Sequence, residues 1–313
     1  MEAAEARADW PVPAQEVLGP RGGLLAWLEC QLVLGFIDGV TRLPTGLHNA
    51  LVGGLARLAR RFDRPHSRAA EEFLLQALGR ELPRAELQRR VLQAWRHLIE
   101  VTLDLEIFER RLDRTRAAEH LEVEMCPEAR ELLARKEGCV VVSGHMGDWE
   151  TGAVMLTWAG FGPLYVVSKP PKNRWLSVHA QRLRESRGLR LIPRRGAMEF
   201  VPAIVRAGGV VAMLLDQRAR QKPVLAPFFG RAAQCDRSAS VLVRRLRAPI
   251  VFAACYRTAD PRRYRLVVPR VVRPEELHGL SAEEVAALVN RELEKLILAA
   301  PDQYFWLHDR WRS

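Results

Sequence analysis

Six short, mostly apolar runs constrain the fold of this chain more than any other feature of its sequence. They lie at residues 139–143, 163–168, 189–192, 210–215, 249–255 and 264–269. Helical patterns are expected between them, near residues 150–159, 175–187, 197–207 and 237–247. Strands that alternate with single helices are typical of a layered α/β sheet. We therefore expect an α/β fold with a mixed or parallel sheet flanked by helices.

The N-terminal third of the chain has a different pattern. Residues 66–120 carry apolar residues at three- and four-residue spacing, which predicts helices. Three segments are expected: a loose tail at residues 1–20, a helical membrane-associating region at 21–125 and an α/β domain at 126–313. A last helix is predicted to begin at Ser281, which forms a capping-box pattern with Glu284, and to stop at Pro301.

Residues 23–62 form an apolar stretch that is too long for an ordinary strand. Charged residues and Pro44 interrupt the stretch within the roughly 20 residues that a bilayer span requires, so a clean transmembrane helix is not expected. Two amphipathic helices lying on the membrane interface fit better, with Arg57, Arg60 and Arg61 facing anionic headgroups. The alternative is that these helices pack on the core of the domain.

The net charge of +11 points to a polyanionic partner, such as a nucleic acid, an anionic membrane surface or an acidic carrier protein. Residues 169–222 hold 13 lysines and arginines against three acids, so the excess is concentrated there. Aromatic residues are not interleaved with these cations and no nucleic-acid-binding motif is visible, which argues against nucleic acid. The five cysteines have no zinc-site spacing and are expected to be reduced thiols of a cytosolic compartment.

The turn after the first apolar run carries the strongest chemical signal. The sequence CVVVSGHMGDWE places His145 just past residues 139–143, between Gly144 and Gly147. Reactive groups in open α/β sheets gather at the carboxyl ends of strands. A carboxylate from Glu150, in the first turn of the next helix, would fix the tautomer of His145 and leave the other ring nitrogen as a base. We interpret the two residues as a candidate catalytic pair.

Motifs of several other enzyme classes are missing from the sequence. It contains no GxSxG elbow, no GxxxxGK phosphate loop and no GxGxxG after a strand. This argues against a serine hydrolase, a P-loop nucleotidase and a dinucleotide-dependent enzyme. With no serine or cysteine nucleophile beside it, a base at His145 suits direct deprotonation of a substrate hydroxyl.

Several motifs in consistent order resemble those of a known family. SGHMGDWE is similar to the HxxxxD/E motif of the lysophospholipid acyltransferases, and more narrowly to that of the bacterial late (lauroyl/myristoyl-type) acyltransferases of lipid A biosynthesis. Further segments resemble the DQ and PFFG motifs, the terminal ending and the N-terminal anchor region of that family: Leu215-Asp216-Gln217, Pro227-Phe228-Phe229-Gly230, PDQYFWLHDRW at 301–311 and RLPTGLHNALVGGLARLARRF. The resemblance covers residues 23–311.

The resemblance implies transfer of a fatty acyl group from a thioester, on acyl carrier protein or coenzyme A, to a hydroxyl of a glycolipid such as a lipid A precursor. His145 would be the general base and Glu150 its orienting carboxylate, with no metal or organic cofactor. The protein would lie on the cytoplasmic face of the bacterial inner membrane, peripherally or anchored by its N-terminal region. The substrate-binding candidates are Lys169, Asn173, Arg174, Arg195, Asp216, Gln217, Phe228, Phe229, Gly230 and Arg237.

Two departures from the family pattern bear on the acceptor. An arginine usually follows the second strand, whereas this chain has Lys169, which keeps the charge without the flat guanidinium fork, and Arg174 further on. After PFFG, only Arg237 matches a Thr-Pro-Arg-Gly-like turn. The acceptor therefore stays open, with a lysophospholipid, a mannoside or an aminolipid as alternatives. A non-catalytic basic membrane-binding protein is the other alternative, and it would have no need of the turn at His145.

Overall fold

The computed structural model describes residues 10–238, 241 and 246–312. The helices among these residues include α1 (Leu24–Thr41), α2 (Thr45–Phe62), α3 (Arg64–Leu78), α4 (Arg84–Arg111), α5 (Ala117–His120), α6 (Pro127–Ala134), α7 (Trp149–Trp158), α8 (Arg174–Ser186), α9 (Ala197–Arg206) and α11 (Ala282–Ala299). Short 3-10 turns are η1 (Arg114–Arg116), η2 (Pro274–Leu277) and η3 (Pro301–Gln303). The strands are β1 (Leu121–Met125), β2 (Cys139–Ser143), β3 (Leu164–Ser168), β4 (Leu189–Pro193), β5 (Val210–Leu214), β6 (Val224–Phe228), β7 (Arg231–Cys235), β8 (Ile250–Arg257) and β9 (Tyr264–Val272).

The main sheet of the described residues has seven strands in the order β1-β9-β8-β2-β5-β3-β4. Strands β8, β2, β5, β3 and β4 run parallel, whereas β9 is antiparallel to β8 and parallel to β1. All six predicted runs are strands, and the predicted α/β class is confirmed. The prediction did not include β1, an edge strand whose polar residues are exposed, or the separate β6–β7 hairpin.

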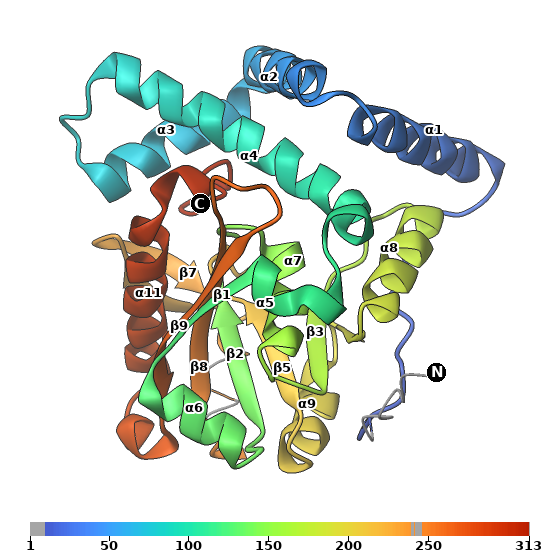
Figure 1. Cartoon of the computed structure of the whole chain (residues 1–313). Coiled ribbons are helices and arrows are strands. Elements are labelled where there is room, and N and C mark those ends of the chain that lie inside the picture. Colours follow the sequence, from blue (N-terminus) through green and yellow to red (C-terminus); the bar gives the residue numbers. More distant parts are fainter. Residues whose placement is uncertain (1–9, 239–240, 242–245, 313) are drawn as a thin grey trace, which may run out of the picture.

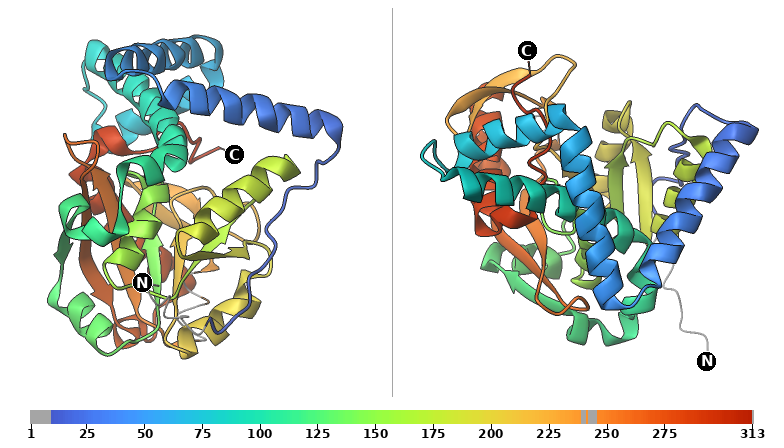
Figure 2. Two further views of the ribbon diagram at one scale, coloured as in Figure 1. Left: turned by 45° about the vertical axis from the view of Figure 1, so that its right-hand side comes forward. Right: turned by 90° about the horizontal axis from the view of Figure 1, so that it is seen from above.

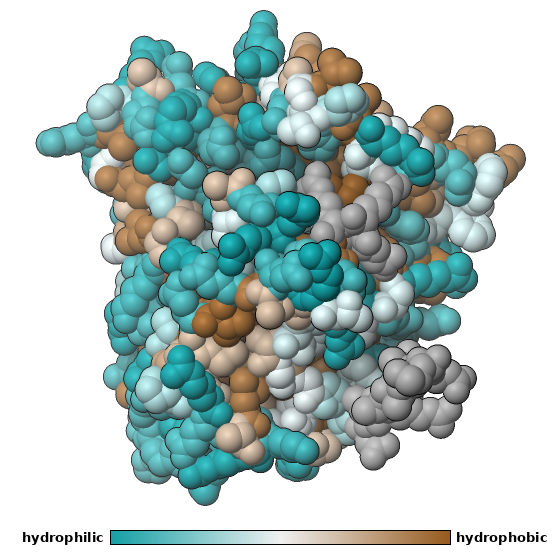
Figure 3. Space-filling view, viewed as in Figure 1, coloured by the Kyte–Doolittle hydropathy of each residue, from teal (hydrophilic) through white to brown (hydrophobic). Residues whose placement is uncertain are grey.

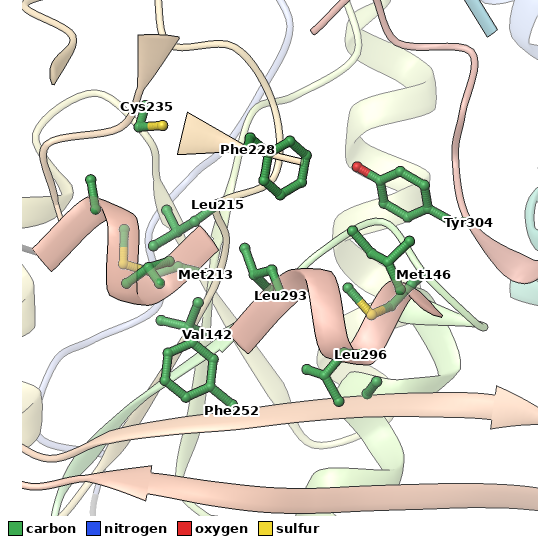
Figure 4. Close-up of a cluster of buried hydrophobic side chains, with 14 of the residues drawn as sticks. Val142, Met146, Met213, Leu215, Phe228, Cys235, Phe252, Leu293, Leu296 and Tyr304 are labelled. Carbon is green, nitrogen blue, oxygen red and sulfur yellow. The ribbon is translucent and has the colours of Figure 1, made fainter. Parts of the chain in front are cut away.

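Alternate side chains of the central strands enter two different cores. On β2, Val140 and Val142 join the core that α9 and α11 cover, and Cys139 and Val141 join the core that α6 and α7 cover. Figure 4 shows the first of these cores, where Val142 and Phe252 lie below Leu293 of α11. A buried valine or leucine stabilises the fold by about 1.5–3 kcal/mol. Both faces of β2 are therefore buried in apolar surroundings, which fixes the position of its carboxyl end.

Helices α1–α4 form a layer above the sheet (Figure 1), with α4 packed against α7 and η3. Seen from above, α1 and α2 diverge as a V from the short turn that joins them (Figure 2, right). Because β2 runs toward this layer and continues into α7, the carboxyl ends of the parallel strands lie beneath α4. His97 of α4 reaches down to Trp149 at the start of α7, with 5.9 Å between ring centroids.

Residues 10–20 pack against the sheet and α8, which differs from the expected loose tail. The backbone N–H of Val12 donates to the hydroxyl of Tyr165, that hydroxyl donates to the carbonyl of Val12, and Val17 is buried. Residues 1–9 of the expected tail lie outside the described residues, and so does part of the helix predicted at 237–247. The boundary expected at 125/126 falls at the end of β1, which already belongs to the sheet.

Helix α1 is, among the described residues, the one helix long and apolar enough to cross a membrane by length and composition. Much of its surface faces outward: Leu25 is 83% exposed and Leu32 75%. Apolar side chains gather over the outer end of α1 in Figure 3. The prediction from sequence was a pair of interfacial helices, and α1 and α2 do form as two helices separated at Pro44.

Candidate active site

The turn between β2 and α7 needs glycine because another backbone passes very close to it. Gly147 has φ +57°, and a Cβ atom there would lie 1.9 Å from the carbonyl oxygen of Cys255. The N–H of Asp148 donates to that carbonyl, and the Asp148 carboxylate caps α7 by accepting from the N–H of Thr151 at 3.0 Å. These contacts hold the turn and so fix the place of His145.

His145 is paired with Asp216, which follows β5, the neighbour of β2 in the sheet. Nδ1 of His145 lies 2.8 Å from Oδ1 of Asp216, and the backbone N–H of His145 donates to Oδ2 at 2.9 Å. Asp216 is buried, and burial alone would raise its pKa; the attraction to His145 and the hydrogen bonds from it outweigh burial and hold the pKa of Asp216 below its usual value. The carboxylate is therefore ionised at neutral pH and accepts two hydrogen bonds from one residue.

This pairing determines which nitrogen of His145 is available. An ionised carboxylate can only accept, so Nδ1 of a neutral ring carries the hydrogen and Nε2 keeps its lone pair. The ring is partly exposed and contacts Trp149, with centroids 5.2 Å apart, and Phe305, at 6.0 Å, and these two aromatic rings lie 6.4 Å from each other. The adjacent aromatic rings limit the positions that the imidazole can take. Nε2 is thus presented as an oriented base.

Glu150 does not make the contact that the sequence analysis expected. Its carboxylate accepts two hydrogen bonds from Arg184 of α8, at 2.8 and 3.0 Å, and this is the pairing that the structure gives it. Burial lowers the pKa of Arg184, but the Glu150 charge and hydrogen bonds raise it overall. Glu150 thus ties α7 to α8, and the carboxylate on His145 is Asp216. The helix direction explains this: Glu150 is in its first turn, one residue past Trp149, which faces His145.

The C-terminal segment holds the turn from the other side. Phe305 donates its N–H to the carbonyl of His145, and Gln303 accepts from the N–H of Gly147 at 2.7 Å. Near Asp216, the N–H of Arg218 donates to Nε2 of His308 at 2.9 Å. Sequence analysis identified this segment only as a family-like ending. No local pattern could reveal its role, because its partners lie about 90 to 160 residues earlier in the chain.

A buried ionic cluster lies between α4 and the turn, and sequence analysis missed it as well. Arg257 at the end of β8 is 2.8 Å from Asp104 of α4 and 3.6 Å from Asp148. Burial, together with the charge of Arg257, lowers the pKa of the neighbouring His97 to about 3, so that imidazole is neutral. The cluster fastens the helical layer over the site.

Three of the predicted cationic candidates lie at the same edge of the sheet. Lys169 follows β3, Arg174 begins α8 and Arg195 follows β4, and all three are exposed. Asn173 is different: it is buried, its oxygen caps α8 and its amide donates to the carbonyl of Ala26 in α1. The structure therefore uses Asn173 to join α8 to α1, where the sequence analysis expected substrate contact.

The PFFG segment is the turn of the β6–β7 hairpin. Phe229 and Gly230 have φ values of +48° and +73°, as a tight two-residue hairpin turn requires. Phe228 is fully buried against Phe73 and Arg310, so its side chain is part of the core and has no surface to offer a substrate. Arg237 is exposed just before residues that lie outside the described part. The groups brought together at His145 are therefore Asp216 and Gln217, whose Nε2 is 3.4 Å from Nε2 of His145.

A histidine–aspartate pair at the carboxyl ends of parallel strands, covered by a helical layer, is typical of α/β enzymes that activate a hydroxyl. Within the described residues, no group of three or more His, Cys, Asp or Glu side chains is arranged to hold a metal ion. The chain matches the family described as "Bacterial lipid A biosynthesis acyltransferase" over residues 22–313, and it belongs to that family.

The names of similar proteins are consistent with this family. The chain is 27% identical over 294 residues to the lipid A biosynthesis lauroyltransferase of Escherichia coli K12, covering 92% of each protein. It is 26% identical over 203 residues to the lipid A biosynthesis palmitoleoyltransferase of Escherichia coli K12, and equally so to a lipid A biosynthesis acyltransferase of Shigella flexneri. The match spans 64% of the length of each of these two relatives.

Proposed function

We propose that the protein is a membrane-associated O-acyltransferase. It would move a fatty acyl group from a thioester, on acyl carrier protein or coenzyme A, to a hydroxyl of a glycolipid such as a lipid A precursor. The observation that carries the proposal is the pairing of Nδ1 of His145 with the buried carboxylate of Asp216 at 2.8 Å. Family membership and the names of the similar proteins support the acyl group and the acceptor class.

The chemistry follows from this pairing. Nε2 of His145 takes the proton of the acceptor hydroxyl while the hydroxyl oxygen attacks the thioester carbon, and the electron pair of the carbonyl moves to its oxygen. When that pair returns, the carbon–sulfur bond breaks and the leaving thiolate takes the proton from His145. General base catalysis of this kind contributes about 10²–10⁴-fold. Asp216 orients His145 and fixes its tautomer, which is the role that the sequence analysis gave to Glu150, and it stabilises the imidazolium that forms.

Substrate recognition is proposed for the exposed cations at the carboxyl edge. Lys169 and Arg174 lie in the connection from β3 into α8 and Arg195 lies in the next one, after β4, and their charges suit the phosphates of a lipid acceptor. The same charges suit an acidic acyl carrier protein, so the donor needs a direct test.

The helical layer supports a location at the membrane surface. A cavity of about 510 Å³ opens between α1, α2 and α4 and is lined by Phe36, Leu58 and Phe62 among other apolar residues. Arg57 and Arg61 are exposed on α2, where they can meet anionic headgroups. We therefore place the protein on the cytoplasmic face of the inner membrane, where thioester donors are available.

The test is an acyl-transfer assay read by mass spectrometry. Purified protein receives acyl carrier protein and coenzyme A thioesters together with lipid A precursor, lysophospholipid, mannoside and aminolipid acceptors. We expect acylated lipid A precursor, and none with a folded His145→Ala variant. Product on another acceptor only would correct the substrate, and full activity of His145→Ala would contradict the mechanism.

A further inference from the structure

Gln217 is the polar side chain that the structure places beside the catalytic nitrogen. Its amide Nε2 lies 3.4 Å from Nε2 of His145. Since Asp216 holds the hydrogen on Nδ1, the lone pair of Nε2 faces Gln217 and the group opposite it must be a donor. The amide NH₂ of Gln217 therefore points at the base in the absence of substrate.

This donor cannot keep its place once an acceptor hydroxyl binds. The hydroxyl must itself donate to Nε2 of His145, so the amide of Gln217 has to release that nitrogen. The oxygen that gains negative charge is bonded to the same carbon that the hydroxyl oxygen attacks, two bonds from the attacking atom. An amide donor next to Nε2 is thus close to the developing charge.

The backbone on both sides of Gln217 is held in place. Leu215 donates its N–H to the carbonyl of Ser143 at 3.0 Å, and Arg218 donates its N–H to His308 at 2.9 Å. Asp216 between them is buried and bonded twice to His145. A donor on a fixed backbone needs little reorganisation when charge appears, which is the property that makes such donors effective in catalysis.

We propose that Gln217 is a catalytic residue whose side-chain amide donates a hydrogen bond to the thioester carbonyl oxygen as that oxygen becomes negative. The inference rests on the proposed acyl transfer and assigns the group that stabilises its tetrahedral intermediate. The bonds formed and broken are those already described, and Gln217 contributes only a hydrogen bond.

The test compares Gln217→Met, which keeps the size and removes the donor, with Gln217→Ala, which also removes the donor, and with Gln181→Met as a control. Gln181 is a part-buried glutamine of α8 that bonds to residues 15 and 17. Loss of one such donor typically costs about 10²–10³ in kcat, and we expect this for Gln217→Met with KM changed by less than about threefold. Gln181→Met should keep the wild-type kcat.

A second measurement separates charge stabilisation from support of the fold. Each protein is assayed with a thioester and with the matching dithioester, whose C=S accepts hydrogen bonds more weakly. The wild type should lose much more rate on this exchange than Gln217→Met. Should the Met variant misfold, Gln217→Ala takes its place in the comparison.

Two results would overturn the inference. One is an unchanged kcat in the folded Gln217 variants, and a higher KM at that constant kcat would mean that Gln217 holds the ground state. The other is an equal loss on the dithioester in wild type and variant. Absence of transfer by the wild type itself would instead refute the proposed function, so the two failures are distinguishable.

Discussion

The surroundings of His145 and helix α1 differ in which kind of side chain they bury and which they expose. Around His145 the buried charged groups have partners. Asp216 contacts the imidazole ring, Asp148 caps the start of α7, and Arg257 forms an ion pair with α4. On α1 the apolar groups are exposed, with Leu25 and Leu32 facing outward. A largely buried region whose charges have partners is suited to moving a proton, and an apolar surface is suited to a lipid environment.

Under the proposed function, the two regions meet different surroundings, which are protein and substrate around His145 and lipid at α1. Buried charges persist around His145 because each has a partner, since an unpaired one would cost several kcal/mol. Exposure of the α1 leucines to water is unfavourable. Transfer of each leucine side chain into an apolar environment would be favourable by about 1.5–3 kcal/mol. Changes in one region should therefore affect catalysis, and changes in the other should affect location.

The largest expected effect is on the catalytic side. Asp216→Asn removes the charge that holds Nδ1–H and stabilises the imidazolium, so kcat should fall by about 10²–10⁴-fold. Steady-state kinetics of folded protein measure this, with Asp260→Asn in the β8–β9 loop as the control. A kcat equal to wild type would show that His145 is oriented by something else.

The next effect should appear on the membrane side alone. Leu25→Glu with Leu32→Glu should weaken binding to anionic vesicles by more than about tenfold, because two apolar contacts are lost and two negative charges added. Co-sedimentation measures the binding. Leu225→Glu, at an exposed leucine of β6, is the matched control. The kcat on detergent-dispersed acceptor should stay within about threefold of wild type, and a large loss of kcat would break the separation of the two regions.

Glu150→Gln should lower stability more than catalysis. The change removes the charge from a bidentate pair with Arg184, and we expect a loss of about 1–3 kcal/mol in the free energy of unfolding. Denaturant unfolding measures it, and Glu122→Gln on the exposed edge of β1 should have no effect. Unchanged stability would mean that the pair does not join α7 to α8.

The smallest effect concerns the contact between α4 and α8. A hydrogen bond from His179 to Glu106 raises the pKa of His179 above its usual 6.5. Its contribution to stability is therefore complete below the unfolded pKa and disappears as the pH rises through the folded pKa. His179→Gln should destabilise the protein at about pH 5.5 and much less at about pH 9, by under about 1 kcal/mol because the pair is partly exposed. An equal effect at both pH values would contradict this.

Much of the fold is predictable from local pattern. The valine-rich run at residues 139–143 is β2 without any shift of its ends, and the capping box at Ser281 begins α11 as expected. β1 was not predicted although its sequence LEVEM alternates apolar and polar residues, because five residues are a short signal directly after a long helical pattern. The contacts of residues 10–20 with Tyr165 depend on packing between distant segments, which no local pattern reports.

The residues of the site could be predicted from the sequence, but the carboxylate that pairs with His145 could not. His145 and Asp216 were both singled out, but the short distance in sequence favoured Glu150 as the partner. In a parallel sheet the neighbour of a strand end is the end of the adjacent strand, and β5 lies beside β2 although it is about 70 residues away. The order of the strands brings Asp216 beside His145, and this order depends on the whole fold.

The most direct test of the central claim compares Asp216→Asn with Glu150→Gln in one acyl-transfer assay, on samples of equal folded fraction. If Asp216 orients His145, kcat of the Asp216 variant should be at least about 30-fold below that of the Glu150 variant. If the order is reversed, with Glu150→Gln inactive and Asp216→Asn active, the pairing seen here is not the one that catalyses the reaction.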